Sequence, residues 1–252
     1  MPWNPDKYHQ FQTQRSAPFD DLLKLVDIRP ELRVVDLGCG TGELTRRLAD
    51  TLPESDVLGL DTSPQMLERT QEYARSGLRF ELGNQAELDG EWDLIFSNAA
   101  LQWSENHEQL IPYLFNRLAP GRQVAVQVPS NHNSKTHLTI IEVAGREPFV
   151  SALSEWARQS PVLSIEGYAD LLFREEAQDI LVFEKVYPHV LENADAIVEW
   201  ISGTALVPYF ERLGDLKDEF TDVIRQELRA AMPGEPVFYP FRRTFFSARK
   251  AD

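Results

Sequence analysis

Three glycines in one short loop are the first residues whose spacing indicates chemistry. Gly38, Gly40 and Gly42 follow directly on the apolar run Val34–Leu37. Because glycine reaches positive φ without strain and has no Cβ, a ligand can touch the backbone of such a loop. The apolar run predicts a buried parallel strand, and leucines spaced four apart after Gly42 predict a helix. The pattern predicts half of a βαβ unit, joined by either a ligand-binding loop or a structural tight turn.

The spacing of these glycines distinguishes between ligand classes. The dinucleotide fingerprint G-x-G-x-x-G needs its third glycine one place later, where this chain has Glu43. The sequence therefore disfavours a nicotinamide-dependent oxidoreductase.

A carboxylate stands at the end of the next predicted strand. Val57–Leu60 is a second apolar run, and Asp61 follows it directly. In a doubly wound sheet the tip of the second strand lies beside the tip of the first, so Asp61 is expected to accept two ribose hydroxyls. The alternative is that Asp61 caps the helix that begins near Pro64.

Polar side chains also follow the third and fourth predicted strands. Leu78–Leu82 leads to Asn84 and Gln85, either of which can contact an adenine edge. Trp92–Phe96 leads to Asn98. The carboxyl ends of these strands meet at one edge of the sheet, where open α/β folds bind ligands.

The elements that must position these residues follow from hydrophobic periodicity and capping signals. The fifth strand is followed by an expected helical cap, and a sixth and a seventh strand complete the sheet. Before and within the core, we expect a helix opened by Pro18, a helix over 110–118, and a turn at Pro120-Gly121 into a strand over 124–128. The cap is expected to contain helices from Ser134 or Thr136 onward and around Leu153, Trp156 and Tyr168. After the cap, we expect a strand over 180–187, helices capped by Asn193 and Asp215, and a last strand over 241–248.

Composition excludes several classes of protein. A formal net charge of −15 opposes non-specific binding to nucleic acid or to an anionic membrane. Cys39 is the single cysteine, so an intrachain disulfide and a multi-thiolate zinc site are excluded. The start of the chain has no signal-peptide pattern, and no apolar run approaches the length of a membrane span. We expect a cytoplasmic protein, and the scattered histidines indicate no metal site.

Several motifs together carry a resemblance to a known superfamily. DLGCGTG, the acidic end of GLDTSPQML, DLIFSNAALQW and LAPGRQVAVQVP occur in the order typical of the class I S-adenosylmethionine-dependent methyltransferases. The match covers about residues 31–128. WNPDKY, NAALQW, VQVP and the closing FRRTFFSAR further resemble the trans-aconitate 2-methyltransferase family. The resemblance implies a Rossmann-like seven-stranded sheet whose last strand is antiparallel. It divides the chain into an arm and helix (1–30), a donor-binding core (31–128), a helical cap (129–178) and a C-terminal part of the sheet (179–252).

The resemblance implies S-adenosyl-L-methionine as methyl donor and S-adenosyl-L-homocysteine as product. The glycine backbone would hold the amino-acid part of the donor, and Asn98 would lie near the sulfonium. Many members of the superfamily have an acidic residue at the position of Asn84, whose oxygen can accept a hydrogen bond without the charge. The implied donor-binding residues are Asp36, Gly38, Cys39, Gly40, Thr41, Gly42, Asp61, Thr62, Met66, Asn84, Gln85 and Asn98.

The implied acceptor is a small polycarboxylic acid that is methylated on a carboxylate. Such a group is ionised at neutral pH, so no general base is required and no catalytic residue is assigned. A polyanion is nevertheless repelled by an acidic chain, so a local basic cluster is needed. The candidates, each of which could instead be a solvated surface charge, are Arg15, His137, Arg242 and Arg243, with Trp103 as a pocket wall or a core residue.

Three other functions remain open from the sequence. One is a methyltransferase acting on a quinone precursor or on another carboxylic acid. Another is the nicotinamide-dependent oxidoreductase that the glycine spacing disfavours. The last is a donor-binding regulator that turns over nothing. The sequence does not indicate the oligomeric state.

Overall fold

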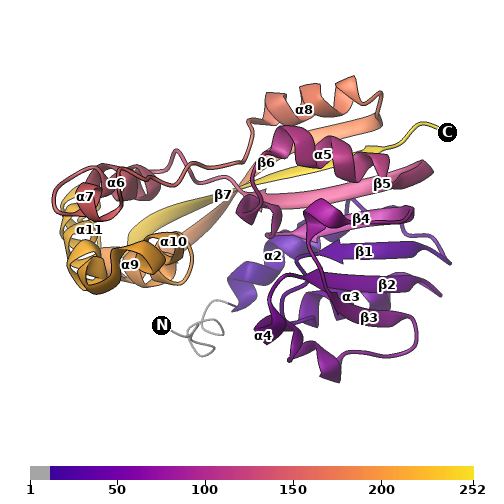
Figure 1. The fold of residues 1–252 in the computed structure, drawn as a ribbon, viewed down its shortest axis with the longest axis horizontal. Coiled ribbons are helices and arrows are strands. Elements are labelled where there is room, and N and C mark those ends of the chain that lie inside the picture. The colour runs from indigo at the N-terminus through magenta and orange to yellow at the C-terminus, as the bar shows by residue number, and fades with distance from the viewer. Residues whose placement is uncertain (1–11) are drawn as a thin grey trace. The chain divides into compact units, whose positions relative to one another are not determined.

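The computed structural model describes the backbone of residues 12–252 and the side chains from Ala17 onward. Residues 1–11, which form much of the expected arm, lie outside the described residues. Seven strands form one sheet in the order β3-β2-β1-β4-β5-β7-β6 (Figure 1). The strands are β1 (Arg33–Leu37), β2 (Asp56–Asp61), β3 (Leu78–Leu82), β4 (Trp92–Asn98), β5 (Leu118–Pro129), β6 (Gln178–Leu191) and β7 (Val237–Arg249).

The centre of the sheet is the parallel, doubly wound arrangement that the sequence predicts. β1 pairs in parallel with β2 on one side and with β4 on the other, and β5 pairs in parallel with β4. β7 pairs antiparallel with β5, which confirms the expected direction of the last strand. β7 lies between β5 and β6, and the sheet edge is formed by β6, whose residues are mostly exposed.

By its internal contacts the chain divides into two compact units. The sheet unit comprises Thr13–Pro129, Pro161–Lys185 and Arg243–Asp252, and the described part of the helical unit comprises Gln12, Ser130–Ser160 and Val186–Arg242. This division differs from the expected cap over 129–178, because the helix around Tyr168 belongs to the sheet unit. The helical elements of the sheet unit are α2 (Gln12–Leu23), α3 (Glu43–Thr51), α4 (Pro64–Leu67), η1 (Thr70–Glu72), η2 (Gln85–Glu87), η3 (Leu101–Trp103), α5 (His107–Asn116) and α8 (Ile165–Arg174).

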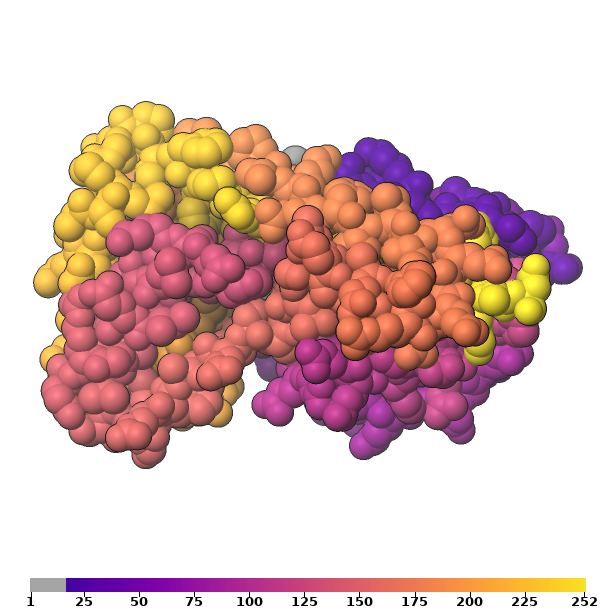
Figure 2. Space-filling view, turned by 90° about the horizontal axis from the view of Figure 1, so that it is seen from above, coloured from indigo at the N-terminus to yellow at the C-terminus, as the bar shows by residue number. Residues whose placement is uncertain are grey.

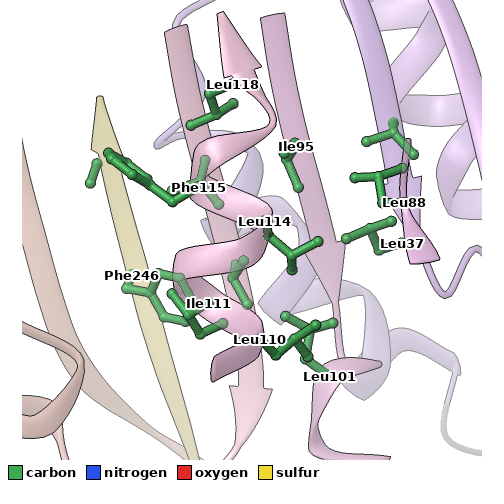
Figure 3. Packing of buried hydrophobic residues seen from close by; sticks show 14 of the residues in the cluster. Leu37, Leu88, Ile95, Leu101, Leu110, Ile111, Leu114, Phe115, Leu118 and Phe246 are labelled. Carbon is green, nitrogen blue, oxygen red and sulfur yellow. The ribbon is translucent and has the colours of Figure 1, made fainter. Parts of the chain in front are cut away.

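The main hydrophobic core lies between the sheet and α5. The apolar face of α5, including Leu110 and Leu114, packs on side chains of β4 and β5 such as Ile95 and Leu118 (Figure 3). α8 packs beside α5, as Figures 1 and 2 show from two directions. α8 belongs to this unit because the ring of its Tyr168 stacks on Phe246 of β7, with 4.7 Å between the ring centroids.

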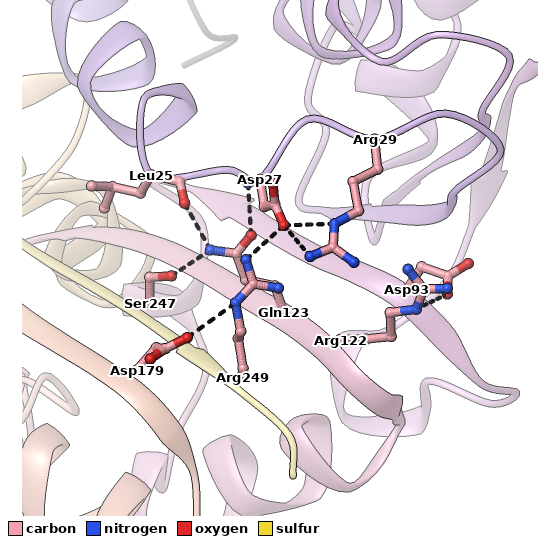
Figure 4. Close-up of polar contacts among 9 residues, drawn as sticks. All are labelled: Leu25, Asp27, Arg29, Asp93, Arg122, Gln123, Asp179, Ser247 and Arg249. Carbon is pink, nitrogen blue, oxygen red and sulfur yellow. Dashed lines mark hydrogen bonds and ion pairs between the residues drawn. The ribbon is translucent and has the colours of Figure 1, made fainter. Parts of the chain in front are cut away.

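The opposite face of the sheet is covered by α2. Phe19 meets Phe96 of β4 edge to face. In the segment that follows α2, Asp27 N donates to the side chain of Gln123 in the middle of β5, and Leu25 O accepts from it (Figure 4). The prediction that Pro18 opens this helix was wrong, since α2 begins at Gln12 and contains Pro18. Burial of the apolar side chains on the sheet outweighs the hydrogen bond that proline removes.

The helical unit contains the helices that lie between β5 and β7 in the chain, except α8. Its side chains confirm two predicted caps: Ser134 accepts from His137 N, and Asn193 accepts from Ala196 N. Asp215 does not cap a helix, because it lies in a 3-10 turn that leads directly into the next helix. The elements of the unit are α6 (Lys135–Ala144), α7 (Phe149–Ala152), α9 (Ala194–Ser202), α10 (Val207–Leu213), η4 (Gly214–Leu216) and α11 (Lys217–Ala231).

Two further predictions differ from the structure. The expected turn at Pro120-Gly121 lies within β5, where the register with β4 shifts between Trp92 and Leu94. Trp156 follows α7 in a segment without regular structure. Within residues 12–252, no helix is long and apolar enough to span a bilayer.

Candidate functional site

The glycine loop leaves β1 at the carboxyl edge of the sheet unit. Its backbone is held by Gly38 N and Cys39 N, which donate to Leu60 O at 2.8 and 2.9 Å. Gly38 has φ +76°, and a Cβ there would lie 2.1 Å from the Cβ of Ala100. At Gly40, by contrast, a Cβ would meet nothing within 4 Å. The loop is therefore fixed on one side and open at Gly40, which is the arrangement a backbone-binding ligand needs.

Asp61 is fixed beside this loop. Its Oδ2 accepts from Gly40 N and its Oδ1 accepts from Ser63 N, both at 2.8 Å. The cap of α4 is Ser63, whose hydroxyl accepts from Met66 N, so Asp61 is not the helix cap. A carboxylate offers about four lone-pair sites, so two remain for ligand hydroxyls.

Asp36 in β1 is a buried acid. Thr45 Oγ1 of α3 donates to its Oδ2 at 2.6 Å. Burial is the main cause that raises the pKa of the Asp36 carboxyl from 3.8 to about 7, and the charge of Asp61 adds to it. Burial also raises the pKa of the Cys39 thiol far above its usual range, so Cys39 is no nucleophile at neutral pH.

The residues expected at the adenine end of a donor already make local contacts. Asn84 accepts from Ala86 N and thereby caps η2, and Gln85 Nε2 donates to Ser104 Oγ. Each amide keeps further hydrogen-bonding capacity. The other predicted contacts in this part, Thr41, Thr62 and Met66, lie in the glycine loop, after β2 and in α4, and each is at least partly exposed.

Asn98 ends β4 with an unsatisfied polar atom. Its Oδ1 is buried and has no hydrogen-bond partner among the described residues. Ala99 follows with φ +55°, a backbone conformation that side-chain-bearing residues rarely adopt. Such strain and an orphaned buried acceptor are typical of a binding site.

A histidine that the sequence did not single out as functional positions the segment after Asn98. His107 is buried, and its Nε2 donates to Leu101 O of η3 at 2.8 Å. Its Nδ1 therefore accepts from Tyr168 OH of α8, at 2.6 Å. Burial lowers the pKa of His107, which keeps the imidazole neutral. The spacing of 61 residues between His107 and Tyr168 explains why no local pattern indicated the pair.

The predicted acceptor residues fall in both units. Trp103 of η3 is 51% exposed, so the core alternative for its side chain does not hold. Arg243 of β7, in the sheet unit, is only 7% exposed, and its Nη1 donates to Gln127 Oε1 at 3.2 Å. Arg15 lies in α2, but its side chain is outside the described ones. Among the expected acceptor-binding residues of the sheet unit whose side chains are described, Arg243 is therefore the buried cation.

His137 and Arg242 belong to the helical unit. Burial, with Arg158 and His132 nearby, lowers the pKa of His137 to about 4, so its imidazole is neutral at pH 7. His137 can donate a hydrogen bond but cannot supply the positive charge that the sequence argument required. Arg242 is exposed, whereas its neighbour Arg243 is buried, because successive strand residues point to opposite faces.

Among residues 12–252, no group of three or more His, Cys, Asp or Glu side chains is placed to hold a metal ion.

Comparisons with known proteins identify the family. Residues 28–178 match the model of a methyltransferase domain. Trans-aconitate 2-methyltransferase of Deinococcus radiodurans is 46% identical, with all of both chains covered. The enzyme of the same name from Variovorax paradoxus is 39% identical over 92% of this chain and 91% of its own.

A solved structure shows the same fold at low identity. Haemonchus contortus phosphoethanolamine N-methyltransferase 2, in complex with S-adenosyl-L-methionine, aligns with a TM-score of 0.57 and 18% identity. The alignment covers 95% of this chain and 53% of that protein. At this identity the likeness concerns the fold, and the family rests on the sequence matches. The chain belongs to the class I S-adenosylmethionine-dependent methyltransferases, within the family of the trans-aconitate 2-methyltransferases.

Proposed function

We propose that this protein transfers a methyl group from S-adenosyl-L-methionine to one carboxylate of trans-aconitate. The products are a monomethyl ester and S-adenosyl-L-homocysteine. The similarity to enzymes of that name along the full chain supports this proposal. The structural observation that carries it is the buried guanidinium of Arg243, a group suited to an anionic acceptor, in the same unit as the glycine loop.

The residues of the glycine loop fit the donor. The open backbone at Gly40 accommodates its amino-acid part, and Asp61 has two lone-pair sites left for the ribose hydroxyls. An ionised Asp36 would be stabilised by an ammonium group, because a nearby cation offsets the burial of the carboxylate. When bound, the donor supplies an electrophilic methyl group. Asn98 Oδ1 is an acceptor whose partial negative charge suits the vicinity of a sulfonium.

The chemical step places few demands on the protein. A carboxylate with a pKa near 4 is ionised at pH 7, so no residue has to remove a proton. One carboxylate oxygen bonds to the methyl carbon while the bond from that carbon to sulfur breaks, and the electron pair stays on sulfur. The protein has to hold oxygen, carbon and sulfur in line, and such positioning can supply about 7–11 kcal/mol.

The acceptor must be held against the charge of the chain. At physiological salt the repulsion by distant acidic residues is screened over about 8 Å, so groups close to the acceptor decide. The guanidinium of an arginine such as Arg243 can form paired hydrogen bonds with a carboxylate. Trp103 is proposed as a wall beside the acceptor.

Acceptor screening tests the proposal against its alternatives. Purified protein and radiolabelled donor are incubated with trans-aconitate, its cis isomer, citrate or a quinone precursor. Transfer to trans-aconitate, with the label released as methanol by mild alkali, supports a carboxyl ester. Alkali-stable label on a quinone precursor would instead show a carbon methyltransferase. Donor binding without transfer to any acceptor would favour a regulator.

A matched pair of variants tests the role of Arg243. Arg243→Lys keeps the charge but removes the planar fork, so we expect a higher KM for trans-aconitate and an unchanged donor Kd. Arg249→Lys is the control, because Arg249 lies on the same strand and pairs with Asp27 at 2.7 Å (Figure 4). An equal effect of both substitutions on the acceptor KM would exclude Arg243 from the site.

The proposed place of action is the cytoplasm, a reducing compartment that suits a chain with a single cysteine. The proposed partner is the small acid alone.

A further inference from the structure

We propose that Gln127 is a further substrate-binding residue, whose amide Nε2 donates a hydrogen bond to a carboxylate of the acceptor beside Arg243. This inference rests on the proposed function and assigns a role to Gln127, a residue of the VQVP motif that was not among the expected site residues.

The first observation is an unsatisfied donor. The Gln127 side chain is fully buried, and its Nε2 has no hydrogen-bond partner among the described residues. Leaving a buried donor unpaired costs about 1–3 kcal/mol, so native structures rarely contain one without a ligand or a water to accept from it.

The second observation is that the orientation of this amide is determined. Arg243 Nη1 donates to Gln127 Oε1 at 3.2 Å. The reversed amide would place NH₂ against the guanidinium, so that two donors would face each other. Arg243 therefore fixes the Oε1 side and leaves Nε2 as the group available to an acceptor.

The third observation is the position of Gln127 at the ligand edge. It pairs with Asn98 of β4 in parallel register, which places the two side chains on the same face of the sheet. Arg243 pairs with Pro129, two residues beyond Gln127, and so lies on that face as well. An amide donor, an amide acceptor and a guanidinium thus gather where β4 and β5 end, and Asn98 is the residue proposed to lie near the sulfonium.

These groups match one end of the proposed acceptor. A carboxylate accepts several hydrogen bonds, and a guanidinium with a neighbouring amide N–H supplies charge and direction together. The neutral amide adds specificity without a second buried charge, because it distinguishes an oxygen anion from an apolar group.

The same strand provides a control residue. Gln123 lies four residues before Gln127 on the same face and is buried too. Its Oε1 accepts from Asp27 N, and its Nε2 donates to Leu25 O and to Ser247 Oγ (Figure 4). Gln123 is thus saturated by the protein, whereas Gln127 is not.

The decisive variant is Gln127→Glu. It keeps the size of the side chain and the oxygen that accepts from Arg243, but it replaces the Nε2 donor by a charged acceptor. The glutamate also places a negative charge beside the acceptor, so Gln127→Met, which removes the donor without adding a charge, is measured with it; an unchanged KM for trans-aconitate in Gln127→Met would exclude Nε2 from the site. If Nε2 binds the acceptor, the KM rises by about tenfold or more in both variants while the Kd for S-adenosyl-L-homocysteine stays unchanged.

Calorimetric titration of trans-aconitate into protein saturated with S-adenosyl-L-homocysteine provides the second readout. Binding to the wild type and weakened binding to both Gln127→Glu and Gln127→Met, with unchanged binding to Gln123→Leu, would support the inference. Wild-type affinity in Gln127→Glu would overturn it while leaving the proposed function intact. Urea unfolding of each variant checks that the Gln127→Glu protein is folded. Failure of the proposed function is distinguishable, because the wild type would then neither bind nor methylate trans-aconitate.

Discussion

Replacing Asp36 by asparagine should make the protein more stable at alkaline pH and weaken its binding of the donor. Asp36 is buried in β1, and its pKa is raised from 3.8 to about 7. At 1.36 kcal/mol per pKa unit, this difference corresponds to about 4 kcal/mol. Above pH 7 the native state contains a buried carboxylate that the unfolded chain exposes to water, so ionisation opposes folding.

The sign of the pH dependence follows from the raised pKa. Between pH 3.8 and about 7 the native state binds a proton that the unfolded state has lost. The stabilising contribution of this proton is complete below 3.8 and is lost as the pH rises through 7. The substituted asparagine carries no charge in either state and still offers an oxygen to Thr45, so we expect Asp36→Asn to gain about 2–4 kcal/mol at pH 8.

Urea unfolding followed by circular dichroism at pH 8 and pH 5 measures this gain. At pH 5 the gain should be smaller by about 2–3 kcal/mol, because wild-type Asp36 is then protonated in the native state. The pKa of His137 is lowered to about 4, so its contribution to the free energy of unfolding decreases as the pH falls. The wild type and the variant share this contribution, and it cancels in the difference between them. An equal difference at both pH values, or a less stable variant at pH 8, would refute the reasoning.

Thr45→Val is the matched control for this experiment. It removes the hydroxyl that donates to Asp36 at 2.6 Å and keeps the volume and branching of the side chain. A hydrogen bond to a charged group contributes about 1.5–3 kcal/mol, so this variant should lose stability at pH 8 and lose less at pH 5. At alkaline pH, Asp36→Asn should therefore raise the free energy of unfolding, and Thr45→Val should lower it.

Three further outcomes are expected. Asp61→Ala should weaken donor binding by about 1.5–3 kcal/mol, and an unchanged affinity in calorimetric titration would remove Asp61 from the site. Gly38→Ala should abolish donor binding even where the protein folds, because its Cβ would lie 2.1 Å from that of Ala100; an intact Kd would contradict this close approach of the two loops. Tyr168→Phe should reduce the free energy of unfolding in urea by about 1–3 kcal/mol, since it leaves Nδ1 of His107 buried and unpaired, and wild-type stability would show that this bond contributes nothing.

The sequence predicts what is encoded locally. The strand over 33–37, the glycine loop and the caps Ser134 and Asn193 depend on residues a few positions apart, and the structure confirms them. The class of the sheet follows from the alternation of apolar strands and helical patterns. Asp61 was placed correctly beside the loop, but the residue that excludes its capping role, Ser63, is visible only in the hydrogen bonds.

The remaining features depend on contacts that are distant in sequence. Gln127 and Arg243 are 116 residues apart, so no local pattern indicates that the amide orients beside the guanidinium. Proline lacks the N–H that a helix interior needs, yet α2 continues through Pro18 because burial of the helix on the sheet stabilises it. The helix around Tyr168 joins the sheet unit because of its packing against Phe246, which its own periodicity cannot show.

The two glutamines of β5 show how one strand can serve both stability and function. Gln123, in the middle of the strand, is saturated by the segment after α2 and by β7, as expected of a residue whose role is structural. At the carboxyl ends of β5 and β4, Gln127 Nε2 and Asn98 Oδ1 are buried atoms without a hydrogen-bond partner among the described residues, and Asp36 is buried with a raised pKa. Each of these three groups lowers the stability of the protein without ligand, and each would be satisfied by a charge or hydrogen-bonding group of the proposed substrates. Such conflicts between local chemistry and folding are expected at binding sites, because a site that was saturated by its own protein would have nothing left to offer a ligand. The location of unsatisfied groups, more than the location of charge, therefore indicates where this sheet binds its substrates.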